Sequence, residues 1–235
     1  MITPITRSRA EEMLARIKRF ATEATKKQMQ EKFGICTDKA VGTTVTTLRA
    51  LVKALPRPDQ DLAEALWQSG IHEARIMASM LADPAQMTRE KLDNWASELN
   101  SWDICDLCCG NLFSKVKNPL KRWIKKEDEF VRRAGFAIIC SLSAPRAKTT
   151  DEDLIKLLPL IKNHSCDPRP MVHKAVNWAL RNIGKKNPRL TPRAVACANE
   201  ILDLYPDNRS ARWVAHNALW ELNLPKTKVM VAKRK

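Results

Sequence analysis

The segment VHKAVNWALRNI, residues 172–183, decides how this chain folds. It places small residues among apolar ones, carries a basic residue near its start, and lies within a helix that we expect at 169–184. Three other segments resemble it: EARIMASML at 73–81, VRRAGFAIICSL at 131–142 and ARWVAHNALWEL at 211–222. The chain is therefore predicted to contain an internal helical repeat.

The repeat has a period that indicates a class of fold. Aligning Arg133, Lys174 and Trp213 gives spacings of 41 and 39 residues, close to the ~40–47 residues of two-helix HEAT-type repeats. Such units bury their faces by stacking on their neighbours. We predict an all-α fold, a HEAT-like helical repeat solenoid forming a curved α-α superhelix, in preference to an irregular helical bundle with chance similarity.

The rest of the chain is also predicted to be helical, because glycine is scarce and prolines separate segments of helical apolar spacing. We expect one repeat domain over residues 1–225 and a basic, flexible tail over residues 226–235. Asp151 is expected to cap one helix, and Asp207 or Asn208 the last one. Besides 169–184, helices are expected at about 59–68, 71–82, 88–99, 103–114, 129–142, 151–162, 191–204 and 208–222.

The charge of the chain indicates the class of its partner. Lys and Arg number 41 against 26 Asp and Glu, a formal net charge of +15. Such an excess attracts phosphate backbones, and counterion release favours nucleic acid over an anionic membrane; a merely soluble basic protein is the alternative. No apolar run approaches the ~20 residues of a membrane span. Seven cysteines, an odd number, fit a reducing compartment. We expect a cytoplasmic protein with no membrane association.

Three stretches together resemble one known family. They are NSWDICDLCCGNLF at 100–113, VRRAG at 131–135 and VHKAVNWALRNIGKKNP at 172–188. In this order they are similar to the AlkD-like DNA alkylation repair family, the HEAT-like repeat DNA glycosylases. With weaker matches upstream, the resemblance extends from about residue 30 to residue 222.

The resemblance implies a DNA glycosylase that hydrolyses the N-glycosidic bond of cationic N3- and N7-alkylated purines in duplex DNA, in base excision repair. By this resemblance Asp106 is the catalytic carboxylate, Trp102 and Trp178 flank the lesion nucleotide, and Arg133 and Arg181 hold the DNA backbone. It also implies a monomer that needs no cofactor and binds double-stranded DNA containing alkylated purines. Related branches bind DNA without excision.

The chemistry of these residue types agrees with such a role. Glycosidic cleavage builds positive charge on the sugar, and a cationic purine leaves as a neutral base, so one carboxylate can stabilise the sugar and position a water. Asp103 lies three residues before Asp106 and is expected to cap the helix, orient a neighbour or share the task. Lys174 is expected to line the concave face. Without the resemblance, a lone acid in a helix is more often solvated or paired, and a tryptophan is more often core.

A metal site is not expected among the cysteines. Cys105 and Cys108 form a C-x-x-C with Cys109 adjacent, but no second ligand pair stands at a zinc-site spacing, so we expect buried thiols and no metal. Five tryptophans are expected to be structural or peripheral: Trp67, Trp95, Trp123, Trp213 and Trp220.

Two other functions fit the same fold class. One is a non-catalytic HEAT-repeat DNA-binding protein for damaged or branched DNA, and the other is a protein-binding scaffold. Asp106 together with both candidate tryptophans favours a monofunctional alkylpurine DNA glycosylase. An assay for the release of bases from methylated DNA would distinguish this enzyme from a non-catalytic DNA-binding protein.

Overall fold

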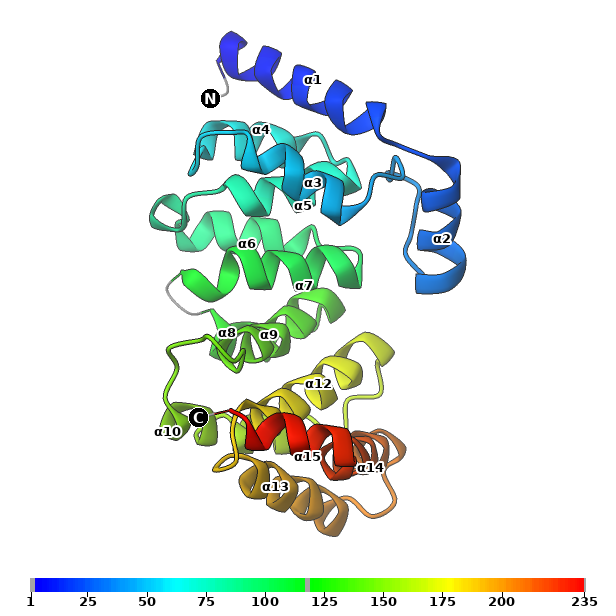
Figure 1. The fold of residues 1–235 in the computed structure, drawn as a ribbon, viewed down its shortest axis with the longest axis vertical. Helices are drawn as coiled ribbons and strands as arrows, with labels where there is room; N and C mark the ends of the chain where they lie inside the picture. The colour runs from blue at the N-terminus through cyan, green and yellow to red at the C-terminus, as the bar shows by residue number, and fades with distance from the viewer. Residues whose placement is uncertain (1–2, 117–118, 235) are drawn as a thin grey trace. The chain divides into compact units, whose positions relative to one another are not determined.

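The computed structural model describes residues 3–116 and 119–234, and within these ranges all regular secondary structure is helical (Figure 1). The chain forms two compact units, Met1–Asn118 and Pro119–Lys235. One repeat domain over 1–225 stays a prediction, since repeats that contact only their neighbours also cluster in this way. None of the described helices combines the length and apolar character that crossing a membrane requires.

The first unit stacks its helices through apolar faces. Helix α4 packs against α1 and α5, and α5 packs against α3 and α7. The buried indoles of Trp67 on α4 and Trp95 on α6 stack with ring centroids 4.0 Å apart. The elements are α1 (Pro4–Arg19), α2 (Glu23–Phe33), α3 (Val45–Lys53), α4 (Gln60–Gln68), α5 (His72–Leu81), η1 (Pro84–Gln86), α6 (Arg89–Ser97), α7 (Trp102–Asn111) and η2 (Phe113–Lys115).

A buried carboxylate holds the connection between α2 and α3. Glu73 on α5 accepts hydrogen bonds from the backbone N–H groups of Val41, Gly42 and Thr43, the shortest 2.7 Å from Gly42. Gly42 has a positive φ of 93°, and a Cβ there would lie 2.5 Å from the Thr22 carbonyl oxygen. Glycine is therefore required at this point, and the loop is fixed against α5.

The second unit has its helices in two layers. One layer consists of α9, α12 and α14, with α12 in contact with the other two. The other layer contains α11 and α13, which contact each other, and α13 also contacts α12 and α14. The three helices of the first layer are the three later segments of the predicted repeat. The elements are α8 (Leu120–Trp123), α9 (Glu129–Leu142), α10 (Asp151–Ile155), α11 (Leu158–Asn163), α12 (Pro170–Lys186), α13 (Thr191–Leu204), α14 (Arg209–Asn223) and α15 (Pro225–Ala232).

The C-terminal residues differ from the prediction of a flexible tail. Pro225–Ala232 form helix α15, which contacts α12 and α14 and buries Thr227 and Val231. These two residues are four apart and share one helix face, so a single buried face docks a segment that is otherwise basic. Lys235 lies outside the described residues.

The helix caps were predicted with mixed success. Asn208 caps α14, as predicted, by accepting from the Ala211 N–H at 2.9 Å. Asp151 is not a cap. Thr150 takes that position, with its hydroxyl accepting from the Asp153 N–H. The expected helix at 151–162 is divided into α10 and α11, because Pro159 must occupy the first turn of a new helix.

A buried carboxylate also sets the start of α12. Asp167 accepts hydrogen bonds from the Arg169 backbone N–H and guanidinium, and from Arg132 of α9 at 2.9 Å. Burial alone would raise the pKa of Asp167, but these bonds lower it to about 2. The ionised carboxylate thus connects α9 to the segment that leads into α12.

Asp167→Asn is expected to destabilise the protein in a pH-dependent way. Because the pKa of Asp167 is lowered on folding, its stabilising effect is present above about pH 4 and is lost as the pH falls towards 2. We expect a loss of about 2 kcal/mol in the free energy of unfolding at pH 7, measured by urea denaturation, and a much smaller loss near pH 2.

The matched control is Asp153→Asn. This exposed carboxylate pairs with Lys156 at 3.0 Å on the surface of α10, where an ion pair contributes about 0–1 kcal/mol. An equal loss from Asp167→Asn at both pH values would contradict the role of its charge.

Candidate functional site

Helix α7 presents two of the predicted site residues on one face. Trp102 and Asp106 are four residues apart and both are half-buried, whereas Ile104 and Cys108 are buried on the other side. Packing of that apolar side orients the helix, and the remaining face carries an indole followed one turn later by a carboxylate.

Asp103 fixes the beginning of α7. It is buried, and its carboxylate accepts from the Ser101 hydroxyl and from Nε2 of His72 on α5 at 2.8 Å. Burial would raise the pKa of Asp103, but the bonds from His72 and Ser101 hold it below its ordinary value. An ionised carboxylate only accepts hydrogen bonds, so His72 donates from Nε2. Of the roles expected for Asp103, this geometry fits that of orienting neighbours.

The Trp102 side chain lies at the rim of a hollow within the first unit. Its Nε1–H donates to the carbonyl oxygen of Phe33 at the end of α2, at 3.0 Å. The hollow measures about 240 Å³, and Met29, Ile76 and Asp103 also line it. The indole is therefore held in place by a hydrogen bond on its edge while it borders open space.

The cysteines of α7 are packing groups. Cys105, Cys108 and Cys109 are buried, as expected. Burial raises the pKa of the Cys108 and Cys109 thiols far above the ordinary value, so both stay protonated at neutral pH and are poor nucleophiles. Within residues 3–116 and 119–234, no three His, Cys, Asp or Glu side chains group as metal ligands.

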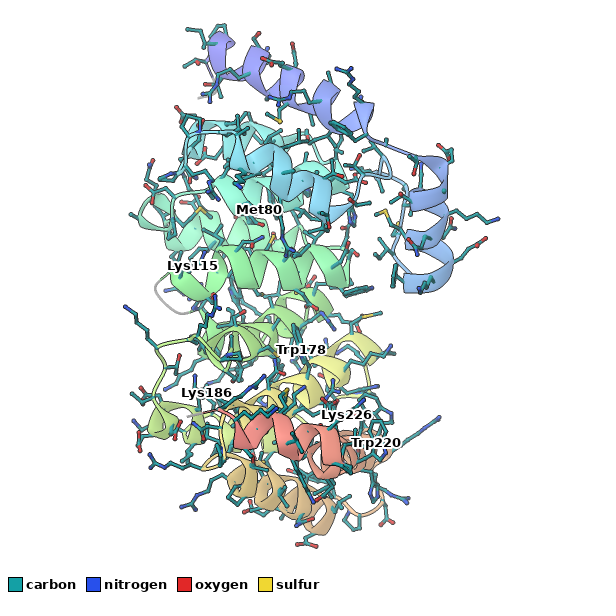
Figure 2. The ribbon with its side chains drawn as sticks, in the orientation of Figure 1. Met80, Lys115, Trp178, Lys186, Trp220 and Lys226 are labelled. Carbon is teal, nitrogen blue, oxygen red and sulfur yellow. The ribbon has the colours of Figure 1, made fainter. Side chains whose placement is uncertain are left out.

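Helix α12 carries three more of the predicted residues in the second unit. Lys174, Trp178 and Arg181 follow one another at spacings of four and three residues, so they share one stripe of the helix. Lys174 is exposed and Trp178 is half-buried, and Figure 2 shows Trp178 on α12. The stripe thus combines an aromatic ring with cationic groups at a partly open surface.

Polar contacts fix α12 against α14. Asn177 Nδ2 donates to the Val214 carbonyl oxygen at 2.8 Å, and Arg181 forms an ion pair with Glu221. Lys185 binds the same carboxylate at 2.6 Å. Burial alone would raise the pKa of Glu221, but Lys185 and Arg181 lower it. Two cations share one anion here, so the cluster keeps a net positive charge.

Arg133 on α9 has a more internal position than the other predicted cations. Arg133 is only 6% exposed, and one of its guanidinium N–H groups donates to the Met171 carbonyl oxygen at 2.7 Å. Arg133 thereby connects α9 to the first turn of α12. Little of its surface remains for the predicted phosphate contact.

The structure thus groups the predicted residues in two sets. Trp102, Asp103 and Asp106 are together on α7, and the α12 stripe and Arg133 belong to the second unit. That the two sets form one active site stays a prediction.

Sequence reasoning assigned no binding role to α14. Of the five tryptophans expected to be structural or peripheral, Trp67, Trp95 and Trp123 are buried, but Trp213 and Trp220 are 41% and 61% exposed. With Arg209 and His216 they recur at spacings of four, three and four residues. This aromatic and basic stripe is visible in the sequence once the helix ends are known.

Comparison with known proteins gives one family match and one similar solved structure. The family model for DNA alkylation repair enzymes matches residues 13–221. Among solved structures, the chain is similar to a member of a family described as related to the HEAT-like repeat DNA glycosylases, with affinity for branched DNA structures. The TM-score is 0.71 and the identity 21%, over 81% of this chain and 82% of that one. No curated protein sequence matches.

The structural likeness confirms the predicted fold class, all-α with HEAT-like repeats. The family match covers most of the sequence, including α7, α9, α12 and most of α14. The chain therefore belongs to the DNA alkylation repair enzyme family.

Proposed function

We propose that the protein is a monofunctional DNA glycosylase that releases cationic N3- and N7-alkylated purines from duplex DNA. The observation that carries the proposal is the half-buried Asp106 on α7, one turn from Trp102, in a chain that belongs to a DNA repair family. A carboxylate held beside an indole is suited to a reaction that generates a cation.

The reaction needs little beyond these groups. The N-glycosidic bond breaks with its electron pair on the purine nitrogen, and because the alkylated purine starts as a cation, it leaves neutral without protonation. Positive charge develops on the sugar, where the Asp106 carboxylate stabilises it and orients a water towards the anomeric carbon. The water adds through its oxygen and releases one proton to the solvent, so that the free base and the sugar are both neutral. Trp102 supplies an electron-rich face to the same charge.

The α12 stripe is suited to the DNA backbone. Lys174 is exposed, and Arg181 retains donors at a site where two cations share one carboxylate. Arg133 stabilises this surface indirectly, because it binds the Met171 carbonyl oxygen in the first turn of α12. The duplex is held mainly by charge, which agrees with the net charge of +15.

Asp106→Asn is expected to reduce base release by at least about 100-fold while the affinity for DNA changes little, because the carboxylate acts on charge that appears only in the transition state. The measurement is the release of methylated purines from alkylated duplex DNA in single-turnover assays. Asp203→Asn, the same change at an exposed acid on α13, is the control and should leave the rate unchanged. Wild-type rates in the Asp106 variant would remove it from catalysis.

Lys174→Ala is expected to weaken duplex binding regardless of sequence or lesion. Loss of one phosphate contact should lower the slope of log affinity against log salt by about 0.9, measured by fluorescence anisotropy between low and physiological salt. Lys156→Ala, which removes an exposed lysine already paired with Asp153, is the control. An unchanged slope in the Lys174 variant would argue against the α12 stripe as the backbone contact.

A non-catalytic DNA-binding role is the second candidate. It is favoured by the described affinity of the structurally similar protein for branched DNA. Tight binding of alkylated duplex by the wild-type chain without base release would establish this candidate in place of the first.

A further inference from the structure

We propose that the exposed face of α14 binds unpaired nucleotides, with a base stacked on Trp213 and phosphates held by Arg209 and Arg212. The surface is called the α14 stripe here and consists of Arg209, Arg212, Trp213, His216 and Trp220. It is distinct from the groups to which the proposed glycosylase activity is assigned, and it does not depend on that activity.

Two large apolar side chains lie in water on this helix. Trp213 and Trp220 are 41% and 61% exposed, although Ala211, Val214 and Ala218 of the same helix are buried. Figure 2 shows Trp220 on α14. Leaving indoles in water forgoes the stabilisation that their burial would give, so a cluster of them on one face marks a binding surface.

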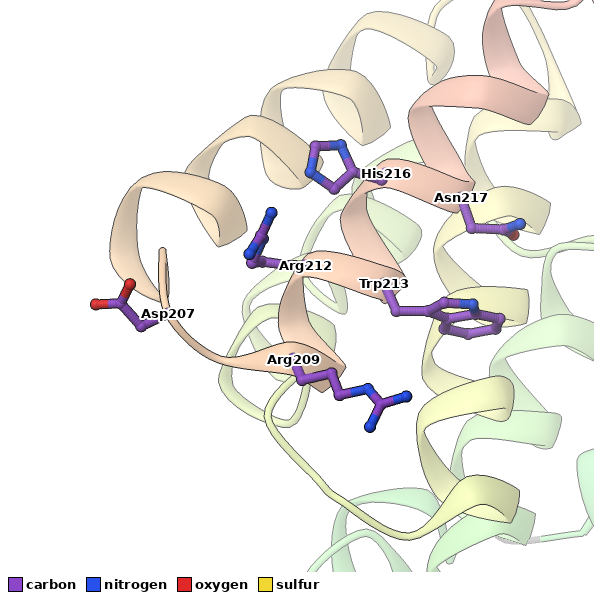
Figure 3. Close-up of a pocket in the computed structure, with 6 residues that line it drawn as sticks. All are labelled: Asp207, Arg209, Arg212, Trp213, His216 and Asn217. Carbon is purple, nitrogen blue, oxygen red and sulfur yellow. The ribbon is translucent and has the colours of Figure 1, made fainter.

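Open space surrounds Trp213 on two sides. One hollow of about 500 Å³ includes Arg212, His216 and Asn217 in its lining, and the other, of about 660 Å³, includes Pro170 and His173. Trp213 and Arg209 line both. In Figure 3, Arg209 and Trp213 project towards one edge of this face of α14, and Arg212 and His216 lie near each other towards its other edge.

The Trp213 ring is positioned by its neighbour on α12. The His173 imidazole lies 4.9 Å from it, with the ring planes inclined at 59°. This contact restrains the indole while much of it stays exposed.

The charge of the α14 stripe selects a nucleic acid. Arg209 and Arg212 are exposed and form no ion pair with any described residue, in contrast to Arg132, Arg169 and Arg181. Asp207 also lines the hollow of about 500 Å³, and its carboxylate points away from both arginines (Figure 3). A second copy of the chain would oppose these cations with like charges, whereas a phosphate backbone neutralises them.

Unpaired bases fit the aromatic part of the surface better than a duplex does. Each base has a flat face that stacks on an indole, and the combination of exposed aromatic rings with arginines is typical of single-strand binding. A duplex keeps its bases stacked on one another and offers only backbone and groove edges. The α14 stripe is therefore suited to a single-stranded tail, gap or fork beside the duplex.

The test compares a blunt duplex with the same duplex carrying a single-stranded thymidine tail, by fluorescence anisotropy. The wild-type protein should bind the tailed DNA about 10-fold more tightly, and Trp213→Ala should abolish this gain. Trp213→Phe should keep most of the gain, because a smaller ring still stacks. Affinity for the blunt duplex and release of alkylated bases from it should be unchanged in both variants.

Leu204→Ala is the matched control, since Leu204 is an exposed apolar residue on α13, 56% exposed. It should retain the full gain from the tail, and thermal unfolding of all variants checks that the fold is intact. Arg209→Ala and Arg212→Ala should each lower the salt slope for a single-stranded oligomer by about 0.7.

Three results would overturn the proposal. The first is equal affinity of the wild-type protein for tailed and blunt DNA. The second is a gain that survives in Trp213→Ala. The third is a concentration-dependent dimer, seen by sedimentation, that Trp213→Ala dissociates, because the α14 stripe would then serve a second copy of the chain. Absence of base release from the wild-type protein would refute the glycosylase while leaving the tail-dependent gain as a separate measurement.

Discussion

The close approach of neighbouring helices through small residues is the constraint on which the second unit depends. A Cβ at Gly184 would lie 2.8 Å from the Leu222 side chain and 2.9 Å from Ala194, so α12 fits against α13 and α14 without spare room. Interiors packed this densely allow few alternative registers. The register in turn decides which face of α12 is buried and which face, with Lys174 and Trp178, meets solvent.

Polar contacts further fix the orientation of helices that pack closely through small residues. The Asn177 bond to α14 and the pairing of Glu221 with Arg181 and Lys185 lie along the α12–α14 contact. At α7, the bond between Asp103 and His72 has an equivalent effect, because it ties the helix that carries Asp106 to α5. In both units, buried polar groups therefore orient the helices whose outer faces carry the candidate chemistry.

Much of the fold could be predicted from the sequence, because its repeat pattern is local. The small-residue segments that begin near Val131, Val172 and Ala211 became α9, α12 and α14. The errors have physical causes. Pro159 begins a second helix where a single helix was expected. Helix α15 buries Val231 and contacts α12 and α14, although the segment is rich in basic residues.

The candidate site was less predictable, because its contacts join distant segments. Nothing near Arg181 in sequence indicates Glu221, 40 residues away, and nothing near Asp103 indicates His72. The internal position of Arg133 follows from its bond to Met171, which requires the packing of α9 on α12. The sequence shows which residue stands at each position. Whether its side chain is exposed, and which side chain it pairs with, depends on the tertiary structure.

The distribution of paired and unpaired cations explains how the excess charge serves function. Arg132 and Arg169 are bound to Asp167, so their charge contributes to the connection of α9 with α12. Arg209, Arg212 and Lys174 are exposed beside aromatic rings of the α12 and α14 stripes. Internal anions thus neutralise the structural arginines, whereas Arg209, Arg212 and Lys174 keep their charge at the surface, where a phosphate could reach it.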